Sequence, residues 1–351
     1  MFSQKLEHNY KLLDNLFLEN DIEWAVVSKL LCGNRMYIEE LIRLGAREIC
    51  DSRISNLKVV KELDPTVNTV YIKPPAAKTI AKVVKYANTS FNTEIETIRA
   101  LSKEAEKQGV MHKVLIMIEL GDLREGVMGE ELLDFYKEVF ELPNINVLGI
   151  GANLNCLHGV MPSQDKLIQL SLYKQLIEAK FNRKIPFVSG GTSVVVPLLF
   201  THQVPKGINH FRVGEMLYFG NNLFTNEPIP ELKQDVFKLY AQIIELTEKP
   251  KVPMGDLATN PSGEEFEIDE NDYGQTHYRA IIDIGLLDVQ PDYLIPDDRS
   301  INVTGASSDM LVLDLGMNDY EYKVGDIITF NLKYMGALSV LNSDYIEKQL
   351  A

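Results

Sequence analysis

A lysine and a glycine-serine stretch in this sequence carry the residue types that could hold a cofactor with an aldehyde and a phosphate. Lys29 follows the apolar run 24–27, with one serine between them. Apolar surroundings disfavour the ammonium form of a lysine, and a neutral amine can form a Schiff base with an aldehyde. The alternative is an ordinary lysine whose long side chain extends into water. Alone, Lys29 does not decide between the two.

The glycine-serine stretch has the composition of a phosphate site. It reads Ser189, Gly190, Gly191, Thr192 and Ser193. Glycines let a backbone approach a ligand closely, and hydroxyl groups donate hydrogen bonds to phosphate oxygens. Gly214 follows a later apolar run and could also contact the phosphate. The alternative for the stretch 189–193 is an ordinary turn that binds no ligand. Together with Lys29, this stretch favours pyridoxal 5'-phosphate (PLP), which carries both an aldehyde and a phosphate.

Eight short apolar runs that alternate with longer amphipathic stretches predict the elements that position these residues. Strands are expected at 24–29, 48–53, 69–74, 89–92, 113–120, 147–154, 187–191 and 211–216. Helices are expected at 35–44, 78–87, 94–109, 130–142 and 164–181. Parallel strands joined by crossover helices give this alternation, so we predict an α/β fold built as a (β/α)8 barrel. An open doubly wound sheet would instead carry a glycine-rich fingerprint at residues 28–30.

The predicted barrel brings polar strand-end residues together, because the active site of such a barrel forms at the C-terminal ends of its strands. Lys29 ends the first strand, and Arg124 follows the fifth. Asn153 ends the sixth strand, and Arg212 lies on the eighth. Phosphate sites in barrels commonly use the loops after strands seven and eight, which here hold the glycine-serine stretch and Gly214. We therefore expect one site at this end of the barrel.

Beyond residue 225 the pattern changes to isolated strands punctuated by proline, glycine and aspartate. Strands are expected at 236–246, 278–284, 301–304, 310–315 and 326–332. This pattern is typical of a separate, mostly β module. We predict two domains, a PLP-binding barrel over 1–228 and a C-terminal β domain over 229–351, which suits a chain of 351 residues.

The composition narrows the classes of partner and location. A formal net charge of -15 disfavours nucleic acid, whose backbone requires clustered lysine and arginine. The longest apolar runs, 114–120 and 194–200, are far shorter than a membrane span, and no signal peptide is recognisable. Three cysteines without metal-ligand spacing and six scattered histidines predict no metal site and a reducing compartment. We expect a cytoplasmic protein that contacts neither membrane nor nucleic acid.

Six motifs, in this order and spacing, resemble the alanine/ornithine racemase family of PLP-dependent enzymes. They are 27–33 (Val-Ser-Lys-Leu-Leu-Cys-Gly), 51–53 (Asp-Ser-Arg), 121–126 (Gly-Asp-Leu-Arg-Glu-Gly), 189–191 (Ser-Gly-Gly), 212–215 (Arg-Val-Gly-Glu) and 305–309 (Gly-Ala-Ser-Ser-Asp). The resemblance covers nearly the whole chain. It implies an isomerase that interconverts L- and D-amino acids by two-base proton transfer at Cα. One departure is the start of the chain, where a helix is expected almost at once and the family's N-terminal strand is short or missing.

The resemblance also implies roles for residues around the cofactor. Lys29 would carry PLP as a Schiff base and act as one of the two bases. Arg212 would meet the pyridine nitrogen, and since an arginine keeps its proton, that nitrogen would stay largely unprotonated. Arg124 would support the phenolic oxygen. Asn153 stands where alanine racemases have a histidine stacked on the ring, and Asn155, with the same strand phase, is the other amide that could face the cofactor.

The second base is implied to be a tyrosine that the C-terminal domain of a partner subunit supplies. Tyr273, in the stretch 273–276 (Tyr-Gly-Gln-Thr), resembles it, and Tyr278 is the alternative. A homodimer would then complete each active site. Asp309 and, as a second candidate, Asp288 could hold the terminal ammonium of ornithine or lysine. For both aspartates, a solvated or loop-capping role is the alternative.

Two other activities of the same fold stay open at this point. A decarboxylase would carry a carboxylate two residues before the matching glycine, where here Arg212 precedes Gly214. A PLP-binding homeostasis protein would be a lone barrel, whereas this chain continues with strands of its own to residue 351. Both comparisons favour a racemase that takes a small-molecule amino acid, with ornithine, lysine or alanine as its substrate.

Overall fold

The structure, a computed structural model, describes residues 1–225, 227–259 and 267–351. It divides into two compact units. The first comprises Met1–Val236 together with Gln349–Ala351, and the second comprises Phe237–Lys348. The first unit extends to Val236, whereas the sequence pattern predicted a boundary at residue 228. The last three residues return to the first unit.

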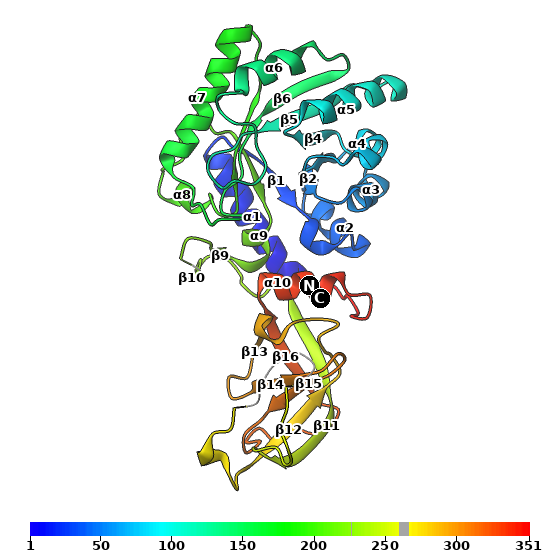
Figure 1. Ribbon diagram of the computed structural model, residues 1–351, viewed down its shortest axis with the longest axis vertical. Coiled ribbons are helices and arrows are strands. Elements are labelled where there is room, and N and C mark those ends of the chain that lie inside the picture. The colour runs from blue at the N-terminus through cyan, green and yellow to red at the C-terminus, as the bar shows by residue number, and fades with distance from the viewer. Residues whose placement is uncertain (226, 260–266) are drawn as a thin grey trace. The chain divides into compact units, whose positions relative to one another are not determined.

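The first unit is a closed barrel of eight parallel strands (Figure 1). Its strands are β1 (Glu23–Val27), β2 (Glu48–Asp51), β3 (Asn68–Tyr71), β4 (Thr89–Asn92), β5 (His112–Met117), β6 (Ile145–Gly151), β7 (Phe187–Thr192) and β8 (His210–Val213). Each strand pairs with the next along the chain, and β8 pairs with β1 to close the sheet. The predicted (β/α)8 barrel is confirmed, with a strand at each of the eight predicted places.

Helices connect the strands and surround the barrel (Figure 1). They are α1 (Ser3–Glu19), α2 (Arg35–Arg43), α3 (Ile54–Leu63), α4 (Ile80–Tyr86), α5 (Ile95–Gln108), α6 (Leu132–Glu141), α7 (Gln164–Phe181), α8 (Pro197–Phe200) and α9 (Glu215–Phe219), with 3-10 turns η1 (Lys29–Leu31) and η2 (Ala77–Thr79). The side chains of Asn34 and Ser163 accept N–H groups at the starts of α2 and α7, and Gly109, directly after α5, has the left-handed conformation. The chain begins with α1, as predicted.

The two ends of the chain lie together in the first unit. Ser3 N donates to Ala351 O at 2.7 Å, and Ala351 N donates to Met1 O at 2.9 Å. The carbonyl oxygen of Gln349 accepts from the Met1 amino group at 2.8 Å and from Tyr37 Oη at 2.9 Å. These hydrogen bonds attach the last three residues to the barrel unit.

Alternate positions of neighbouring strands fill the barrel interior, because successive side chains of a strand point to opposite faces. The apolar part of this interior comprises Ala25, Val27, Cys50, Val70, Phe91, Leu115 and Met117. Ala25 lies directly opposite Arg212 in the β1–β8 pair, so the Arg212 side chain shares the face that the apolar cluster occupies. Arg212 is only 3% exposed, and a buried guanidinium requires hydrogen-bond partners.

The second unit is built on a six-stranded antiparallel sheet. Its strands, in the spatial order β13-β16-β11-β12-β15-β14, are β11 (Lys238–Pro250), β12 (Thr276–Ile282), β13 (Leu294–Pro296), β14 (Asn302–Ala306), β15 (Leu311–Asp314) and β16 (Ile327–Leu332). The unit also contains α10 (Tyr334–Asn342) and the turns η3 (Glu270–Asp272) and η4 (Pro291–Tyr293). The first unit adds a short pair, β9 (Asn221–Asn222) and β10 (Glu227–Pro228). The predicted strands of this half correspond to β11, β12, β14, β15 and β16, whereas β13 and α10 were not predicted.

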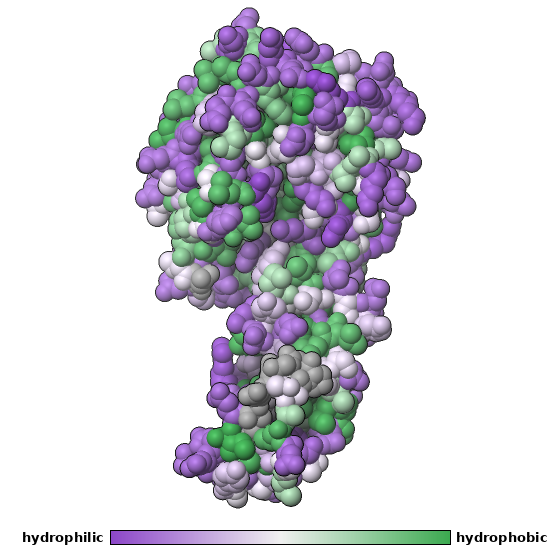
Figure 2. Space-filling view, viewed as in Figure 1, coloured by the Kyte–Doolittle hydropathy of each residue, from purple (hydrophilic) through white to green (hydrophobic). Residues whose placement is uncertain are grey.

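Hydrophilic residues cover most of the face of the first unit that Figure 2 shows, with small apolar areas scattered between them. Scattered exposed apolar residues are normal on protein surfaces. Within the described residues, the helices are all too short or too polar to cross a membrane.

Candidate active site

Lys29 lies just beyond the C-terminal end of β1, at the start of η1. The strand ends at Val27, and Ser28 turns the chain. Ser28 N donates to Cys50 O at 2.9 Å and Ser28 Oγ donates to Asp51 Oδ2 at 2.8 Å, which ties the turn to β2. Of the two environments considered for Lys29, the structure has the exposed one. The burial that the apolar run suggested is therefore absent, because the strand ends earlier than predicted.

A buried carboxylate fixes the turn that carries Lys29. Asp51 is fully buried and accepts hydrogen bonds from Ser28 Oγ, from Arg53 N at 2.8 Å and from Asn56 Nδ2 at 3.1 Å. Burial raises the pKa of the Asp51 carboxyl, and these hydrogen bonds oppose the rise without cancelling it. The Asp-Ser-Arg motif thus serves mainly to hold the backbone around the lysine.

Arg212 is a buried cation at the same end of the barrel. Its Nη2 donates to Ala152 O at 2.8 Å, and its Nη1 donates both to Ser189 O at 3.1 Å and to Ser189 Oγ. The guanidinium carbon also lies 5.2 Å from the centre of the Phe91 ring. Burial lowers the pKa of the Arg212 guanidinium, but an arginine stays charged in proteins. The strand β7 and the end of β6 therefore fix the position of this charge.

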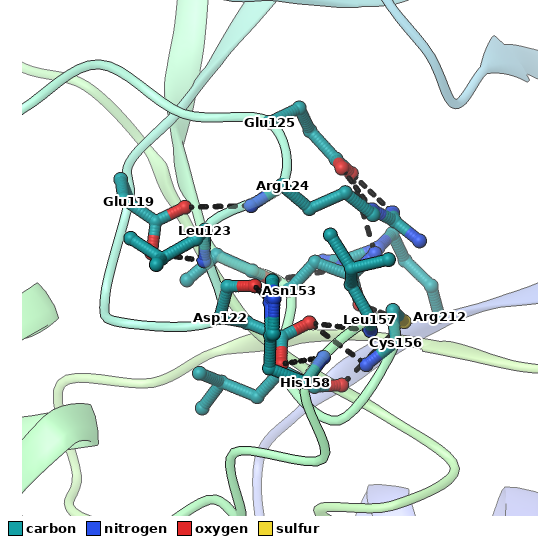
Figure 3. Close-up of polar contacts among 12 residues, drawn as sticks. Glu119, Asp122, Leu123, Arg124, Glu125, Asn153, Cys156, Leu157, His158 and Arg212 are labelled. Carbon is teal, nitrogen blue, oxygen red and sulfur yellow. Dashed lines mark hydrogen bonds and ion pairs between the residues drawn. The ribbon is translucent and has the colours of Figure 1, made fainter.

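Arg124 lies in the loop after β5 and is paired with a carboxylate that the sequence patterns did not single out as a site residue (Figure 3). Nε and Nη2 of Arg124 donate to the two carboxylate oxygens of Glu125 in a bidentate ion pair. Glu125 Oε1 also accepts from Asn153 Nδ2 at 3.3 Å. Burial alone would raise the pKa of Glu125, but Arg124 and Asn153 hold it below its usual value. The position of Glu125 directly after Arg124 is the signal that could have identified it.

The two asparagines predicted near the cofactor lie in a loop. Strand β6 ends at Gly151, so neither Asn153 nor Asn155 is part of it, and the inference from a shared strand phase is wrong. Asn153 contacts Glu125, whereas Asn155 has a left-handed backbone conformation with a φ of 60°. Of the two, Asn153 is the one connected to the other site residues.

A buried aspartate joins the loops after β5 and β6 (Figure 3). The Asp122 carboxylate accepts four backbone N–H groups of the later loop, from Cys156 and Leu157 at 2.9 Å each and from His158 and Val160 at 3.2 Å each. Burial alone would raise the pKa of the Asp122 carboxyl, but these N–H groups hold it below its usual value. The loop that carries Arg124 is therefore anchored to the loop after β6.

A second carboxylate shapes the loop after β5 itself. Glu119 accepts hydrogen bonds from the backbone N–H groups of Gly121, of Leu123 at 3.0 Å and of Arg124 at 3.2 Å. Leu123 has a φ of 52°, a left-handed conformation that is unfavourable for a residue with a side chain. The hydrogen bonds to Glu119 compensate for that conformation and set the position of Arg124.

We expect Asp122→Asn to loosen the loop after β6. An asparagine keeps one carbonyl oxygen but turns its NH2 group towards two of the four N–H groups, which then lack an acceptor. The free energy of unfolding should fall by about 2 kcal/mol, as measured by urea denaturation. Amide hydrogen exchange over 156–160, measured by mass spectrometry, should become faster.

Asp64→Asn provides the matched control for this experiment. Asp64 accepts from Thr66 N at 2.8 Å in the loop before β3, at the opposite end of the barrel. Its replacement should leave hydrogen exchange over 156–160 unchanged. If Asp122→Asn also left that exchange unchanged, Asp122 would not be the anchor of the loop.

The glycines of the predicted phosphate site have a packing role. A Cβ on Gly191 would lie 2.3 Å from the Phe211 ring, and a Cβ on Gly190 would lie 2.7 Å from the Ile208 side chain. The missing side chains thus make room for residues of the barrel itself. These contacts account for glycine at both positions, and the approach of a ligand to the backbone of Gly190 and Gly191 stays a prediction.

The loops after β7 and β8 are joined by a serine hydroxyl. Ser193 Oγ accepts from Gly214 N and from Met216 N, at 3.2 Å each. A Cβ on Gly214 would lie 3.0 Å from Cβ of Val27, so this glycine also serves close packing. Thr192 ends β7 and is half-buried, which leaves its hydroxyl as a donor at the end of the barrel.

The donor groups at this end of the barrel fit PLP in chemical type. Lys29 presents an exposed primary amine that suits an aldehyde. Arg124 and Arg212 present guanidinium groups that suit a ring nitrogen and negatively charged oxygens. The hydroxyl of Thr192 suits a phosphate. These groups come from the C-terminal ends of β1, β5, β7 and β8.

The tyrosines considered as the second base lie in the second unit. Tyr273 follows η3, and its side chain is 63% exposed. The next residue, Gly274, has a φ of 79°, so the chain turns sharply there. Tyr278 lies on β12 and is half-buried. Tyr273 is therefore the more accessible of the two phenols.

The aspartates considered for substrate recognition also lie in the second unit. Asp309 is exposed, and its Oδ1 accepts from Ser308 Oγ at 3.1 Å. Asp288 accepts from Gly285 N at 3.3 Å and from Ser343 Oγ at 2.9 Å, one on each carboxylate oxygen. The arrangement around Asp288 is the loop-capping alternative, whereas Asp309 presents its carboxylate to the exterior.

The family model described as alanine racemase, N-terminal domain, matches residues 3–222. Two characterised relatives match over nearly the whole chain. Ornithine racemase of Acetoanaerobium sticklandii is 38% identical over 347 residues, which cover 99% of this chain and 97% of that protein. Lysine racemase of Thermotoga maritima is 30% identical over 346 residues, which cover 98% of this chain and 96% of that protein.

Solved structures share the fold of both units. Alanine racemase of Clostridium difficile 630 superposes with a TM-score of 0.75 at 16% identity, covering 100% of this chain and 94% of that one. Alanine racemase from Bartonella henselae with covalently bound pyridoxal phosphate also gives a TM-score of 0.75 at 16% identity, covering 100% of this chain and 98% of that one.

Proposed function

This chain belongs to the family of the alanine racemase N-terminal domain, and we propose that it interconverts the two enantiomers of ornithine. It is an amino-acid racemase, an isomerase that acts at Cα. The observation that carries the choice of ornithine is the near full-length similarity to ornithine racemase, which exceeds the similarity to lysine racemase.

Pyridoxal phosphate is the cofactor of this racemase. When bound, it supplies an electron sink that makes the Cα proton of an amino acid acidic. We assign Lys29 to its covalent attachment, Arg212 to its pyridine nitrogen and Arg124 to its phenolic oxygen. The hydrogen bonds to Ser189 O and Ala152 O support this assignment because they hold the guanidinium in place. An arginine donates a hydrogen bond to a ring nitrogen without transferring its proton.

The remaining cofactor residues are assigned by their positions around Arg212 and Arg124. Thr192 and the backbone near Gly214 are assigned to the phosphate, because they lie at the C-terminal ends of β7 and β8. Asn153 is assigned to the ring, next to the Arg124–Glu125 ion pair. Ser189 acts through Arg212, since its hydroxyl is fully buried against the guanidinium.

Racemisation requires one base on each face of Cα, and we assign these roles to Lys29 and Tyr273. Lys29 is exposed at the end of β1 and can reach a ligand above the barrel. Tyr273 is exposed in the second unit, which suits a residue that acts on another subunit. We propose a homodimer in which Tyr273 of each subunit completes the site of the other, located in the cytoplasm.

Asp309 is our candidate for the terminal ammonium of ornithine. Its carboxylate is exposed, whereas the two carboxylate oxygens of Asp288 accept from Gly285 N in its own loop and from Ser343 Oγ at the end of α10. A carboxylate that contacts the terminal ammonium of a side chain adds affinity only for substrates whose side chain carries such a group. Asp309 would thus distinguish ornithine from alanine.

The proposed function is tested by incubating the purified enzyme with single enantiomers of ornithine, lysine, alanine and arginine, followed by chiral chromatography. Ornithine should reach an equal mixture of enantiomers fastest. Asp309→Asn should raise the KM for ornithine and leave the KM for alanine unchanged, because only ornithine offers the second ammonium. Release of carbon dioxide in place of the opposite enantiomer would contradict the proposal, as would the absence of any exchange.

A further inference from the structure

A chain of hydrogen bonds runs through the barrel interior and ends at Arg212. Arg212 Nη1 donates to Ser189 Oγ, which lies 2.6 Å from His210 Nδ1. On the other side of the imidazole, His210 Nε2 lies 2.9 Å from Glu48 Oε1. Ser189, His210 and Arg212 are each at least 96% buried. We call these four residues, Glu48, His210, Ser189 and Arg212, the buried chain.

The direction of each hydrogen bond in the buried chain follows from its ends. An arginine only donates, so Ser189 Oγ accepts from Arg212 and has its own O–H left to donate. The carboxylate of Glu48 only accepts, so His210 Nε2 carries a proton. If Nδ1 is unprotonated, it accepts the Ser189 O–H, and every donor in the chain has one acceptor. The hydrogen bonds of the buried chain are all satisfied when His210 carries its proton on Nε2 and not on Nδ1.

The groups around the buried chain define the surroundings of the imidazole. Burial alone would raise the pKa of the Glu48 carboxyl, but the contacts with His210 and Asn68 and the charge of Lys113 hold it below its usual value. The Phe187 ring lies 5.2 Å from the imidazole, centre to centre, and offers no competing acceptor in its side chain. A protonated Nδ1 would instead place two cationic donors on the single hydroxyl of Ser189 and leave its O–H without an acceptor.

We propose that His210 is a positioning residue for racemisation, acting through Ser189 on Arg212. His210 Nδ1 accepts a hydrogen bond from the Ser189 O–H, which turns a lone pair of the hydroxyl towards the guanidinium. Glu48 holds the imidazole in the tautomer that can do this. The proposal rests on the assignment of Arg212 to the pyridine nitrogen, because the precise position of that guanidinium matters only if it contacts the cofactor.

The first test is the tautomer of His210 in the holoenzyme. Long-range proton–nitrogen correlation on the protein with nitrogen-15 in its histidines separates the two ring nitrogens, and the six histidines make assignment by substitution practical. The resonances lost in His210→Gln belong to His210. We expect a protonated Nε2 and an unprotonated Nδ1 at neutral pH. A protonated Nδ1 would overturn the proposal.

The second test compares His210→Phe with His210→Gln. Phenylalanine removes both hydrogen bonds of the imidazole, and we expect kcat to fall by roughly 10- to 100-fold, with a smaller change in KM. The visible absorbance band of the bound cofactor should shift, because the environment of its pyridine nitrogen changes. Glutamine can accept from Ser189 and donate to Glu48, so His210→Gln should recover most of kcat and restore the band.

His112→Phe is the matched control for these variants. His112 lies on β5, is 2% exposed and contacts Ser90 Oγ at 2.8 Å, so its replacement also removes a buried imidazole from the barrel. It should lower stability without shifting the cofactor band. Equal losses of kcat in His210→Phe and His112→Phe, with the band unchanged in both, would overturn the positioning role. The two proposals can fail separately. If the enzyme racemised no amino acid but His210 had the expected tautomer, the proposed function would be refuted and the hydrogen bonds of the buried chain would stand.

Discussion

Lys29→Ala should abolish racemisation together with the covalent retention of the cofactor. The variant removes the amine that we propose attaches PLP and one of the two proposed bases, so turnover should fall by roughly 10⁴-fold or more. Reduction with borohydride followed by mass spectrometry of the denatured chain measures the attachment directly. The wild-type chain should gain the mass of the reduced cofactor, and the Lys29→Ala chain should not. The turn around the missing side chain should persist, because Asp51 and Ser28 hold it through groups that the substitution leaves in place.

Lys73→Ala is the control for this result. Lys73 lies two residues beyond β3, at the same end of the barrel, with its Nζ 5.9 Å from the centre of the Tyr71 ring. Its replacement should change neither the attached mass nor the rate of racemisation. If Lys29→Ala retained the cofactor and Lys73→Ala lost it, the site would have to be built around β3 and not around β1.

Tyr273→Phe should stop proton transfer on one face of the substrate only. Without the phenolic O–H, racemisation should fall by roughly 10²- to 10⁴-fold, because each turnover requires both bases. Lys29 can still remove and return the Cα proton on its own face. In deuterated water, one enantiomer of ornithine should therefore take up deuterium at Cα without inversion, whereas the other should not. Chiral chromatography coupled to mass spectrometry separates these outcomes.

Tyr278→Phe distinguishes the two tyrosines. The variant should leave the rate of racemisation and the rate of deuterium uptake at Cα close to those of the wild type, because Tyr278 is half-buried on β12. If Tyr278→Phe gave the one-sided exchange and Tyr273→Phe did not, the base would be Tyr278.

Mixing the two inactive variants tests whether Tyr273 acts across subunits. A hybrid of one Lys29→Ala subunit and one Tyr273→Phe subunit contains a site with an intact lysine from one chain and an intact tyrosine from the other. Refolding or co-expression of the pair should restore part of the activity. No recovery in verified hybrids would place both bases in the same chain.

The barrel could be predicted from the sequence because its signals are local and repeated. Strands such as β4, over 89–92, and helices such as α7, over 164–181, have the predicted bounds. The second unit was less predictable where its elements are short. Strand β13 has three residues and ends in Pro296, so it gives too little periodicity to identify. Helix α10 follows β16 almost directly, so its start is not marked by a separate loop.

The sequence predicted that the candidate site residues lie at the strand ends, but it did not predict the environment of each residue. Lys29 is exposed because β1 ends at Val27, and a boundary shift of two residues decides between a buried and an exposed amine. The glycines 190–191 suggested a ligand, but Ile208 and Phe211 fill the space beside them. Sequence patterns show which residues lack a side chain, and only packing shows what occupies the space.

The buried chain was beyond prediction for a different reason. Glu48 and His210 are 162 positions apart in sequence and meet because the last strand of the barrel closes on the first two. Each residue taken alone is a polar residue at the start of a strand, which has many ordinary explanations. Only the closed sheet shows that the hydrogen bonds of both lead to Arg212.

The return of the last three residues to the barrel makes the smaller unit an insertion in the chain and not an appendage. Cutting the protein after Val236 would remove the partners of Ser3, Tyr37 and the Met1 amino group, and so would damage the barrel that the cut was meant to isolate. A faithful excision has to rejoin 236 to 349 with a linker. The smaller unit is in this sense a cassette with two attachment points, and exchanging it between relatives requires both junctions to be matched.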